Sequence, residues 1–367
     1  MGRVGLVAAW LAGLALALPA GALCWPPVFE GGKRLNQRFQ HPTTWLELAF
    51  RQHEACWRRP GSDDEQRIFV FGNSGVFGHP LPAETTFIER LNEAFAADGT
   101  PAHLFNLGHV YTDQLKDALI PQEALAYEPD LLLVALTLDD FSHLAPTPYE
   151  PLAAFFEDNR ATLHALAETA PSGLEEPLAR YREALPAFAA SESFTRGLRE
   201  TGRFVRYTAR SYADALRRRF LLPEGHLPPD GIPPNERRHL RRQTRYDCAK
   251  TQAKYAKLFT GWQEWSVLPW LAELRERTGV RVALLNWPVA HEPVGACYNV
   301  RLPEVALREF NAVIRAEASR LNLPLLDLHD LLAPDDFFDS LHPRPKGQRK
   351  IAERLAPEIR ALLAGER

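Results

Sequence analysis

The chain has 367 residues, of which 46% are apolar, so it is long enough for one large domain or two ordinary ones with a substantial core. Its 43 lysines and arginines against 46 aspartates and glutamates give a net charge of -3. Because phosphate recognition needs clustered positive charge, this balance argues against a nucleic-acid-binding protein. One basic run at 235–245 is interpreted as a solvated face, with an anionic polymer or a membrane surface as the alternative.

The chain begins with an apolar segment that predicts export. Arg3 precedes an uncharged run over 4–22, which ends in the small-x-small sequence Ala20-Gly21-Ala22 of a signal peptidase site. A bilayer span takes roughly 20 residues, so an uncleaved membrane anchor fits as well. With either reading, residues 1–22 are a signal peptide or anchor, and we expect the bulk of the chain to be periplasmic or otherwise extracytoplasmic.

The four cysteines lie outside any zinc-binding pattern, because no pair has CxxC spacing. In an exported protein an even number of cysteines permits disulfides. Four cysteines allow three pairings, among which the sequence does not choose. Proximity along the chain suggests Cys24–Cys56 and Cys248–Cys297, and free buried thiols are the alternative.

After an N-terminal extension over 23–65, strand-like and helix-like patterns alternate. Near-continuous apolar runs predict five strands, at 67–72, 102–108, 129–137, 280–288 and 323–328. Apolar residues at helical spacing predict helices at 83–98, 113–127, 266–279, 302–321 and 346–363, with Pro121 kinking or splitting the second. Residues 141–265 are mostly helical and charged, and they interrupt the alternation.

This order predicts an α/β fold. Alternating strands and helices imply a parallel sheet with right-handed crossovers. We therefore expect a flavodoxin-like, three-layer α/β/α domain with a five-stranded parallel sheet, formed by 66–140 and 266–367. A large helical insertion over 141–265 separates the third strand from the fourth.

Polar residues follow each predicted strand, where open parallel sheets bind their ligands. They are Asn73 and Ser74, then Gly108 and His109, then Asp139 and Asp140, then Asn286, Trp287 and His291, and finally Asp339 and His342. A serine hydroxyl becomes a nucleophile when a base takes its proton and a third group orients that base. The Asp-x-x-His spacing of Asp339 and His342 suits this, so Ser74 is the candidate nucleophile.

These residues resemble the SGNH, or GDSL-type, hydrolase superfamily. The resemblance rests on Gly72-Asn73-Ser74, on Gly108 and on Asp339-Ser340-Leu341-His342, and it covers 66–140 and 280–363. It implies that Ser74 attacks an ester or thioester carbonyl, that His342 is the base and that Asp339 orients His342. It also implies an oxyanion hole from the N–H groups of Ser74 and Gly108, and it calls for no cofactor.

The third oxyanion donor of the superfamily departs from the pattern. An asparagine is expected where this chain has Asp139, and an ionised carboxylate has no proton to donate. The loss of such a donor typically costs about 10²–10³ in rate. Three readings stay open: a protonated Asp139, an Asp139 that points away, or another donor such as Asn73. A catalytically weak or inactive polysaccharide-binding or scaffold protein is the alternative function.

The apolar N-terminus and the helical insertion resemble a branch that acylates cell-envelope polysaccharides. That resemblance implies an acylated polysaccharide or a small ester as substrate, and a membrane-bound O-acyltransferase as partner. Hydrolysis and acyl transfer share the acyl-enzyme on Ser74, so the sequence leaves both open.

Other polar residues have weaker assignments. Asn73, Asn286 and Trp287 are candidates for substrate binding, and the last two otherwise cap a strand. His79, His109 and His143 are too loosely spaced to predict a metal site.

Overall fold

The computed structural model describes residues 64–78, 81, 85–109, 114–141, 166, 267–290 and 304–365. The chain divides into two compact units, Met1–Asp63 with Ala189–His226 and Asp64–Phe188 with Leu227–Arg367, and every described residue belongs to the second. The predicted N-terminal segment, all four cysteines and almost all of the predicted insertion lie outside the described residues. Among the helices that are described, none has the length and apolar character of a membrane span.

Five parallel strands form one sheet, as the sequence predicts. In chain order they are β1 (Gln66–Phe71), β2 (Ala102–Asn106), β3 (Leu131–Leu136), β4 (Arg281–Asn286) and β5 (Leu325–Asp327). Their spatial order is β2-β1-β3-β4-β5, and all four pairings are parallel. The carboxyl ends of the strands therefore meet at one edge of the sheet, where the candidate residues are expected.

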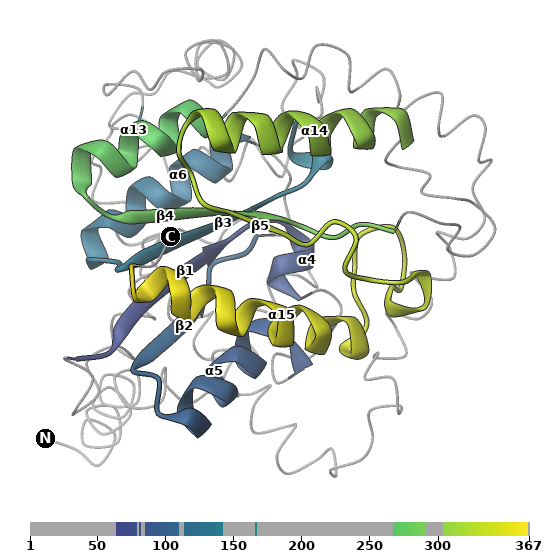
Figure 1. The fold of residues 1–367 in the computed structure, drawn as a ribbon, viewed down its shortest axis with the longest axis horizontal. Helices are drawn as coiled ribbons and strands as arrows, with labels where there is room; N and C mark the ends of the chain where they lie inside the picture. The colour runs from purple at the N-terminus through teal and green to yellow at the C-terminus, as the bar shows by residue number, and fades with distance from the viewer. Residues whose placement is uncertain are drawn as a thin grey trace, which may run out of the picture. The chain divides into compact units, whose positions relative to one another are not determined.

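Helices cover both faces of the sheet, which confirms the predicted fold class. They are α4 (Ser74–Phe77), α5 (Phe87–Asp98), α6 (Gln114–Ala124), α13 (Leu268–Thr278), α14 (Glu304–Arg320) and α15 (Pro345–Leu363). Figure 1 shows α5 and α15 on one face and α6, α13 and α14 on the other. Helix α6 continues through Pro121, so the expected split of this helix is wrong. Its N-terminal half is anchored by burial, which outweighs the hydrogen bond that a proline removes.

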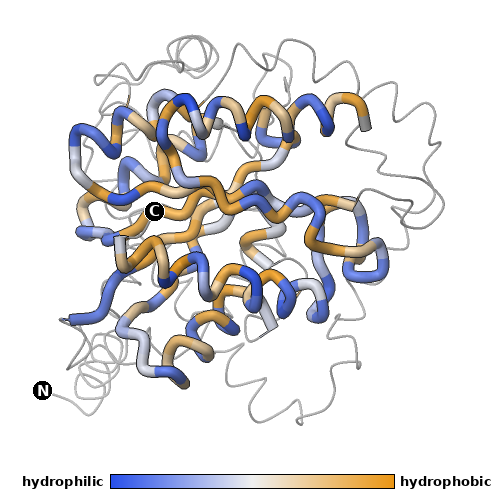
Figure 2. The backbone as a smooth tube through the Cα atoms, in the orientation of Figure 1, coloured by the Kyte–Doolittle hydropathy of each residue, from blue (hydrophilic) through white to orange (hydrophobic). Residues whose placement is uncertain are grey.

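The core lies between the sheet and its helices, and the strands carry most of it. All six residues of β3 are buried, as expected for a strand covered on both faces. Figure 2 shows the strands as the hydrophobic centre of the described fold. Apolar residues at helical spacing join α5 and α15 to alternate strand residues in one cluster, which includes Ile68, Val70, Phe87, Leu91, Phe95, Ile351, Leu355 and Ile359.

Candidate active site

A tight turn at the end of β1 presents Ser74. Gly72 has a φ of 153°, and a Cβ there would lie 2.6 Å from Cγ2 of Val76, so only glycine fits this position. Asn73 then caps the short helix α4, because its side-chain oxygen accepts a 2.9 Å hydrogen bond from the Gly75 N–H. The strand, the glycine and the cap together hold Ser74 at the carboxyl edge of the sheet.

A closed loop between β5 and α15 presents the acid and the histidine. A short 3-10 turn, η6 (Pro334–Asp336), leads into it, and an antiparallel bridge joins Phe337 to Pro343. The Phe338 N–H donates a 2.8 Å hydrogen bond to the His342 carbonyl, which fixes the residues between them as a compact turn. Hydrogen bonds within the loop thus fix the backbone positions of Asp339 and His342 without help from the rest of the site.

The structure brings Ser74, His342 and Asp339 into one hydrogen-bonded line. Ser74 Oγ lies 2.8 Å from His342 Nε2, across 268 residues of chain. His342 Nδ1 lies 2.8 and 2.9 Å from the two Asp339 oxygens. The backbone N–H groups of Leu341 and His342 also donate to Asp339 Oδ1, at 2.9 and 3.0 Å. This is the arrangement that removes a proton from a serine hydroxyl.

Asp339 remains ionised at neutral pH in this setting. Burial acts to raise the pKa of Asp339, but the His342 imidazole and the backbone donors lower it further than burial raises it. An ionised Asp339 accepts the Nδ1 proton of His342, which leaves Nε2 as the acceptor that faces Ser74. The carboxylate therefore selects the tautomer that a general base requires.

The three expected oxyanion donors differ in availability. Within the described ranges, the Ser74 N–H has no backbone acceptor. The Gly108 N–H instead donates a 3.0 Å hydrogen bond to Asn106 Oδ1. Asp139, in the 3-10 turn η3 (Leu138–Phe141), is a buried carboxylate beside Asp140. Of the two backbone N–H groups that the resemblance implies as oxyanion donors, that of Gly108 therefore already has an acceptor.

A series of buried hydrogen bonds joins the serine turn to the residues that follow β3. Asn73 Nδ2 donates to Thr137 Oγ1 at 3.0 Å, and Thr137 donates from both its N–H and its hydroxyl to Asp140 Oδ2, at 2.7 and 3.0 Å. Burial and the neighbouring Asp117 carboxylate raise the pKa of Asp140 well above its usual range. Asn73 is 2% exposed, so its side chain serves the turn and presents almost no surface to a substrate.

A second support comes from an ion pair in α6 that sequence reasoning missed. Lys116 and Asp117 are fully buried, with 2.8 Å between Nζ and Oδ1, and Lys116 also donates to the Gly72 carbonyl at 3.2 Å. Residues 114–124 also contain Gln114, Gln122 and Glu123, so the local sequence gives no signal that this charged pair is buried. His109 lies nearby; burial and then the Lys116 charge lower its pKa to about 3, so its imidazole is neutral.

Asn286 is the last residue of β4 and Trp287 directly follows it, but their side chains face inward, and both residues are 1% exposed. Asn286 Nδ2 donates to Asn311 Oδ1 at 3.0 Å and to Asp327 Oδ1 at 2.9 Å. The Trp287 indole packs against the serine turn and donates to the Leu341 carbonyl at 3.3 Å. The structure gives neither side chain an exposed face for a substrate.

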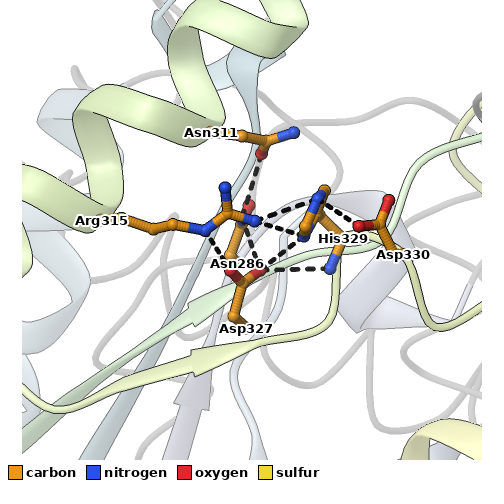
Figure 3. A network of polar contacts seen from close by, with 6 residues as sticks. All are labelled: Asn286, Asn311, Arg315, Asp327, His329 and Asp330. Carbon is orange, nitrogen blue, oxygen red and sulfur yellow. Dashed lines mark hydrogen bonds and ion pairs between the residues drawn. The ribbon is translucent and has the colours of Figure 1, made fainter.

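Asn286 belongs to a polar network that joins α14 to the end of β5 (Figure 3). Arg315 Nε donates to Asp327 Oδ2 at 2.6 Å, and His329 Nδ1 lies 2.9 Å from Asp327 Oδ1. His329 Nε2 lies 2.6 Å from Asp330 Oδ2. Arg315 thus links this second Asp–His pair to α14.

Within the described ranges, no three His, Cys, Asp or Glu side chains are grouped to hold a metal ion. The candidate histidines His79, His143 and His291 lie outside these ranges.

Comparison with known proteins found distant structural likeness only. No protein-family model matches the chain, and the search of curated proteins returned no relative. The solved structures that resemble it include the psychrotrophic esterase EstA from Pseudoalteromonas sp., at 12% identity over 82% of this chain and 100% of that one, with a TM-score of 0.39. An aryl esterase of M. smegmatis is 13% identical over 81% and 99%, with a TM-score of 0.37.

A carbohydrate acetylesterase family member from Sinorhizobium meliloti is 11% identical over 82% and 99% of the two chains, with a TM-score of 0.37. These neighbours are esterases by name. Likeness at this level carries no argument about function or residues, so any proposed chemistry rests on the geometry of the site.

Proposed function

We propose that this protein is a serine-dependent carboxylic ester hydrolase that forms an acyl-enzyme on Ser74. The observation that carries the proposal is the contact of Ser74 Oγ with His342 Nε2 at 2.8 Å, together with the 2.8 Å contact of His342 Nδ1 with Asp339. The resemblance of the sequence to the SGNH superfamily assigns the same three residues the same roles.

The proposed reaction needs only these groups and water. As Ser74 Oγ adds to the ester carbonyl, its proton passes to His342 Nε2, and Asp339 stabilises the imidazolium. The tetrahedral intermediate then collapses, and Nε2 returns the proton to the departing alcohol oxygen. A water molecule attacks the acyl-enzyme in the same way and releases the carboxylic acid. We propose that the Ser74 N–H donates to the oxyanion in both steps.

Reaction with a fluorophosphonate probe tests this proposal, because such probes label activated serines. We expect labelling of the wild-type protein and complete loss in Ser74→Ala and His342→Ala. His329→Ala is the matched control, because it removes a histidine that also contacts an aspartate, at 2.9 Å, but lies outside the site. Labelling of His342→Ala at the wild-type rate, in protein with an unchanged circular dichroism spectrum, would refute the role of His342.

We further propose that the physiological substrate is an acyl ester of a cell-envelope or extracellular polysaccharide. The support is the resemblance to the O-acylation branch and the apolar segment at 4–22, which predicts export. A membrane-bound O-acyltransferase is the proposed partner. Mass analysis of an acyl donor mixed with a polysaccharide acceptor separates the two chemistries: an acylated polymer supports transfer, and free acid alone supports hydrolysis.

Two observations favour a catalytically weak or inactive binding protein instead. The Gly108 N–H is engaged by Asn106 at 3.0 Å, and Asp139 offers a carboxylate where an amide donor is expected. The loss of each donor typically costs about 10²–10³ in rate. The fluorophosphonate experiment decides, because folded wild-type protein that stays unlabelled supports the binding function.

A further inference from the structure

Trp287 lies between the two halves of the candidate site. It directly follows β4, and its N–H donates a 3.1 Å hydrogen bond to the Leu136 carbonyl, which extends the pairing of β4 with β3 by one residue. The side chain is 1% exposed. Because the indole is buried and its backbone is bonded to the centre of the sheet, the ring has little freedom to move and can hold neighbouring residues in place.

The indole fits against the turn that carries Ser74. A Cβ on Gly75 would lie 2.6 Å from Trp287 Nε1 and 2.9 Å from Cε2, so the ring occupies the space that any larger residue beside Ser74 would need. Phe87 of α5 packs on the indole as well, with 5.4 Å between the ring centroids. The ring is therefore held between α5 and the turn that carries the nucleophile.

The indole N–H reaches the histidine loop. Trp287 Nε1 donates a 3.3 Å hydrogen bond to the carbonyl of Leu341, the residue directly before His342. The Ala290 N–H donates to the Ser340 carbonyl at 3.0 Å, so a second bond from the same segment holds the same loop. A buried indole N–H without a partner costs free energy, which favours the loop position that accepts this bond.

We propose that Trp287 is a positioning residue that sets the distance between Ser74 and His342; this inference rests on the esterase function proposed above. The two catalytic side chains come from turns 268 residues apart, and the indole touches the neighbour of each. Proton transfer requires that separation to stay near 2.8 Å, and a misplacement of about 1 Å can cost 10²-fold in rate.

The test compares two buried tryptophans replaced by phenylalanine. Trp287→Phe keeps an aromatic ring but removes the donor to Leu341. Trp270→Phe is the matched control: Trp270 is 0% exposed in α13, and its indole nitrogen has no hydrogen-bond partner among the described residues. We expect kcat for a small ester and the rate of fluorophosphonate labelling to fall about 10- to 100-fold in Trp287→Phe. KM should stay within about threefold, and Trp270→Phe should keep both rates within about twofold.

A purely structural role of Trp287 would give a different pattern. Both variants would then lose stability, yet each folded molecule would react at the wild-type rate. That result would overturn the inference. Loss of labelling in Ser74→Ala in the same experiment would show that the proposed function still holds. If wild-type protein itself is not labelled, the proposed function fails and the inference falls with it. β-(3-Benzothienyl)alanine at position 287 provides a second variant that keeps the two-ring shape and lacks the N–H. It should reproduce the loss in kcat, and a wild-type kcat in that variant also overturns the inference.

Discussion

Replacing Lys116 with methionine should strongly destabilise the fold, because it leaves the Asp117 carboxylate buried without its partner. Both side chains are 0% exposed, and Nζ lies 2.8 Å from Oδ1. The variant also removes the 3.2 Å hydrogen bond to the Gly72 carbonyl. Methionine fills a similar volume, so little of the cost comes from a cavity. Removal of one partner from a buried ion pair lowers the free energy of unfolding by about 3–5 kcal/mol, and we expect a loss in this range at pH 7.

The size of this loss should depend on pH. Burial raises the pKa of Asp117, and the Lys116 charge opposes that rise, so the variant raises the pKa further. A carboxyl whose pKa is higher in the folded than in the unfolded protein destabilises the fold increasingly as pH rises between the two values. The deficit of Lys116→Met relative to wild type should therefore grow with pH, by up to about 1.4 kcal/mol per unit, and shrink in mild acid.

Urea unfolding of wild type, Lys116→Met and the double variant Lys116→Met/Asp117→Asn at pH 5, 6, 7 and 8 measures both effects. The double variant removes both charges. Replacement of a whole buried ion pair by neutral groups is often close to neutral, so we expect its stability to lie within about 2 kcal/mol of wild type at every pH. Equal losses in the single and double variants, or a deficit that does not change with pH, would refute the assignment of the cost to an unpaired carboxylate.

Two further predictions concern aspartates. Asp139→Asn restores an amide donor, so kcat for a small ester should stay unchanged or rise by up to about 10²-fold, and a loss beyond tenfold would show that the carboxylate has another role. Asp336→Asn should weaken the attachment of the histidine loop to α15, because Asp336 accepts hydrogen bonds from Lys350 at 2.5 Å and from the Ala333 N–H at 3.0 Å. Burial acts to raise the pKa of Asp336, but these donors lower it overall, so its stabilising effect is present above about pH 4 and lost as pH falls. Thermal melts should accordingly show a gap between wild type and Asp336→Asn that closes below pH 4, and a gap that persists in acid would contradict this.

The sheet and the Ser–His–Asp geometry were accessible from the sequence because both follow from simple rules. Runs such as Leu131–Leu136 are apolar throughout, and short continuous apolar runs are typical of strands that are buried on both faces. Parallel strands bring their carboxyl ends to one edge, so residues that follow the first and last strands can meet there. Ser74 and His342 do so at 2.8 Å.

The orientation of Trp287 was less accessible because it depends on which face of β4 each residue takes. Ala283, Leu285 and Trp287 share the core on the face of α5 and α15, whereas Asn286 points to Asn311 of α14. Alternation along the strand predicts this division once one residue is assigned to a face. Without that assignment, the sequence does not show whether Asn286 and Trp287 line a pocket or support a loop.

The burial of Lys116 could not be predicted from local pattern at all. Lysine in a helix is usually exposed, and burial becomes tolerable only where a carboxylate and a carbonyl receive the ammonium. One of these partners, Gly72, lies 44 residues away at the tip of β1. Only the folded sheet brings the two together, so the support beneath the serine turn is a property of tertiary structure.

The candidate site therefore depends on the register of strands that carry none of its three central side chains. β3 and β4 lie between β1 and β5 in the sheet, and β4 ends at the residue before Trp287. A slip of β4 by one residue against β3 would turn the indole to the face of α14, away from Gly75 and from the Leu341 carbonyl. Ser74 and His342 would then keep their local turns but lose the side chain that contacts a neighbour of each. The 2.8 Å contact between them is thus as much a consequence of strand pairing at the centre of the sheet as of the two loops that carry it.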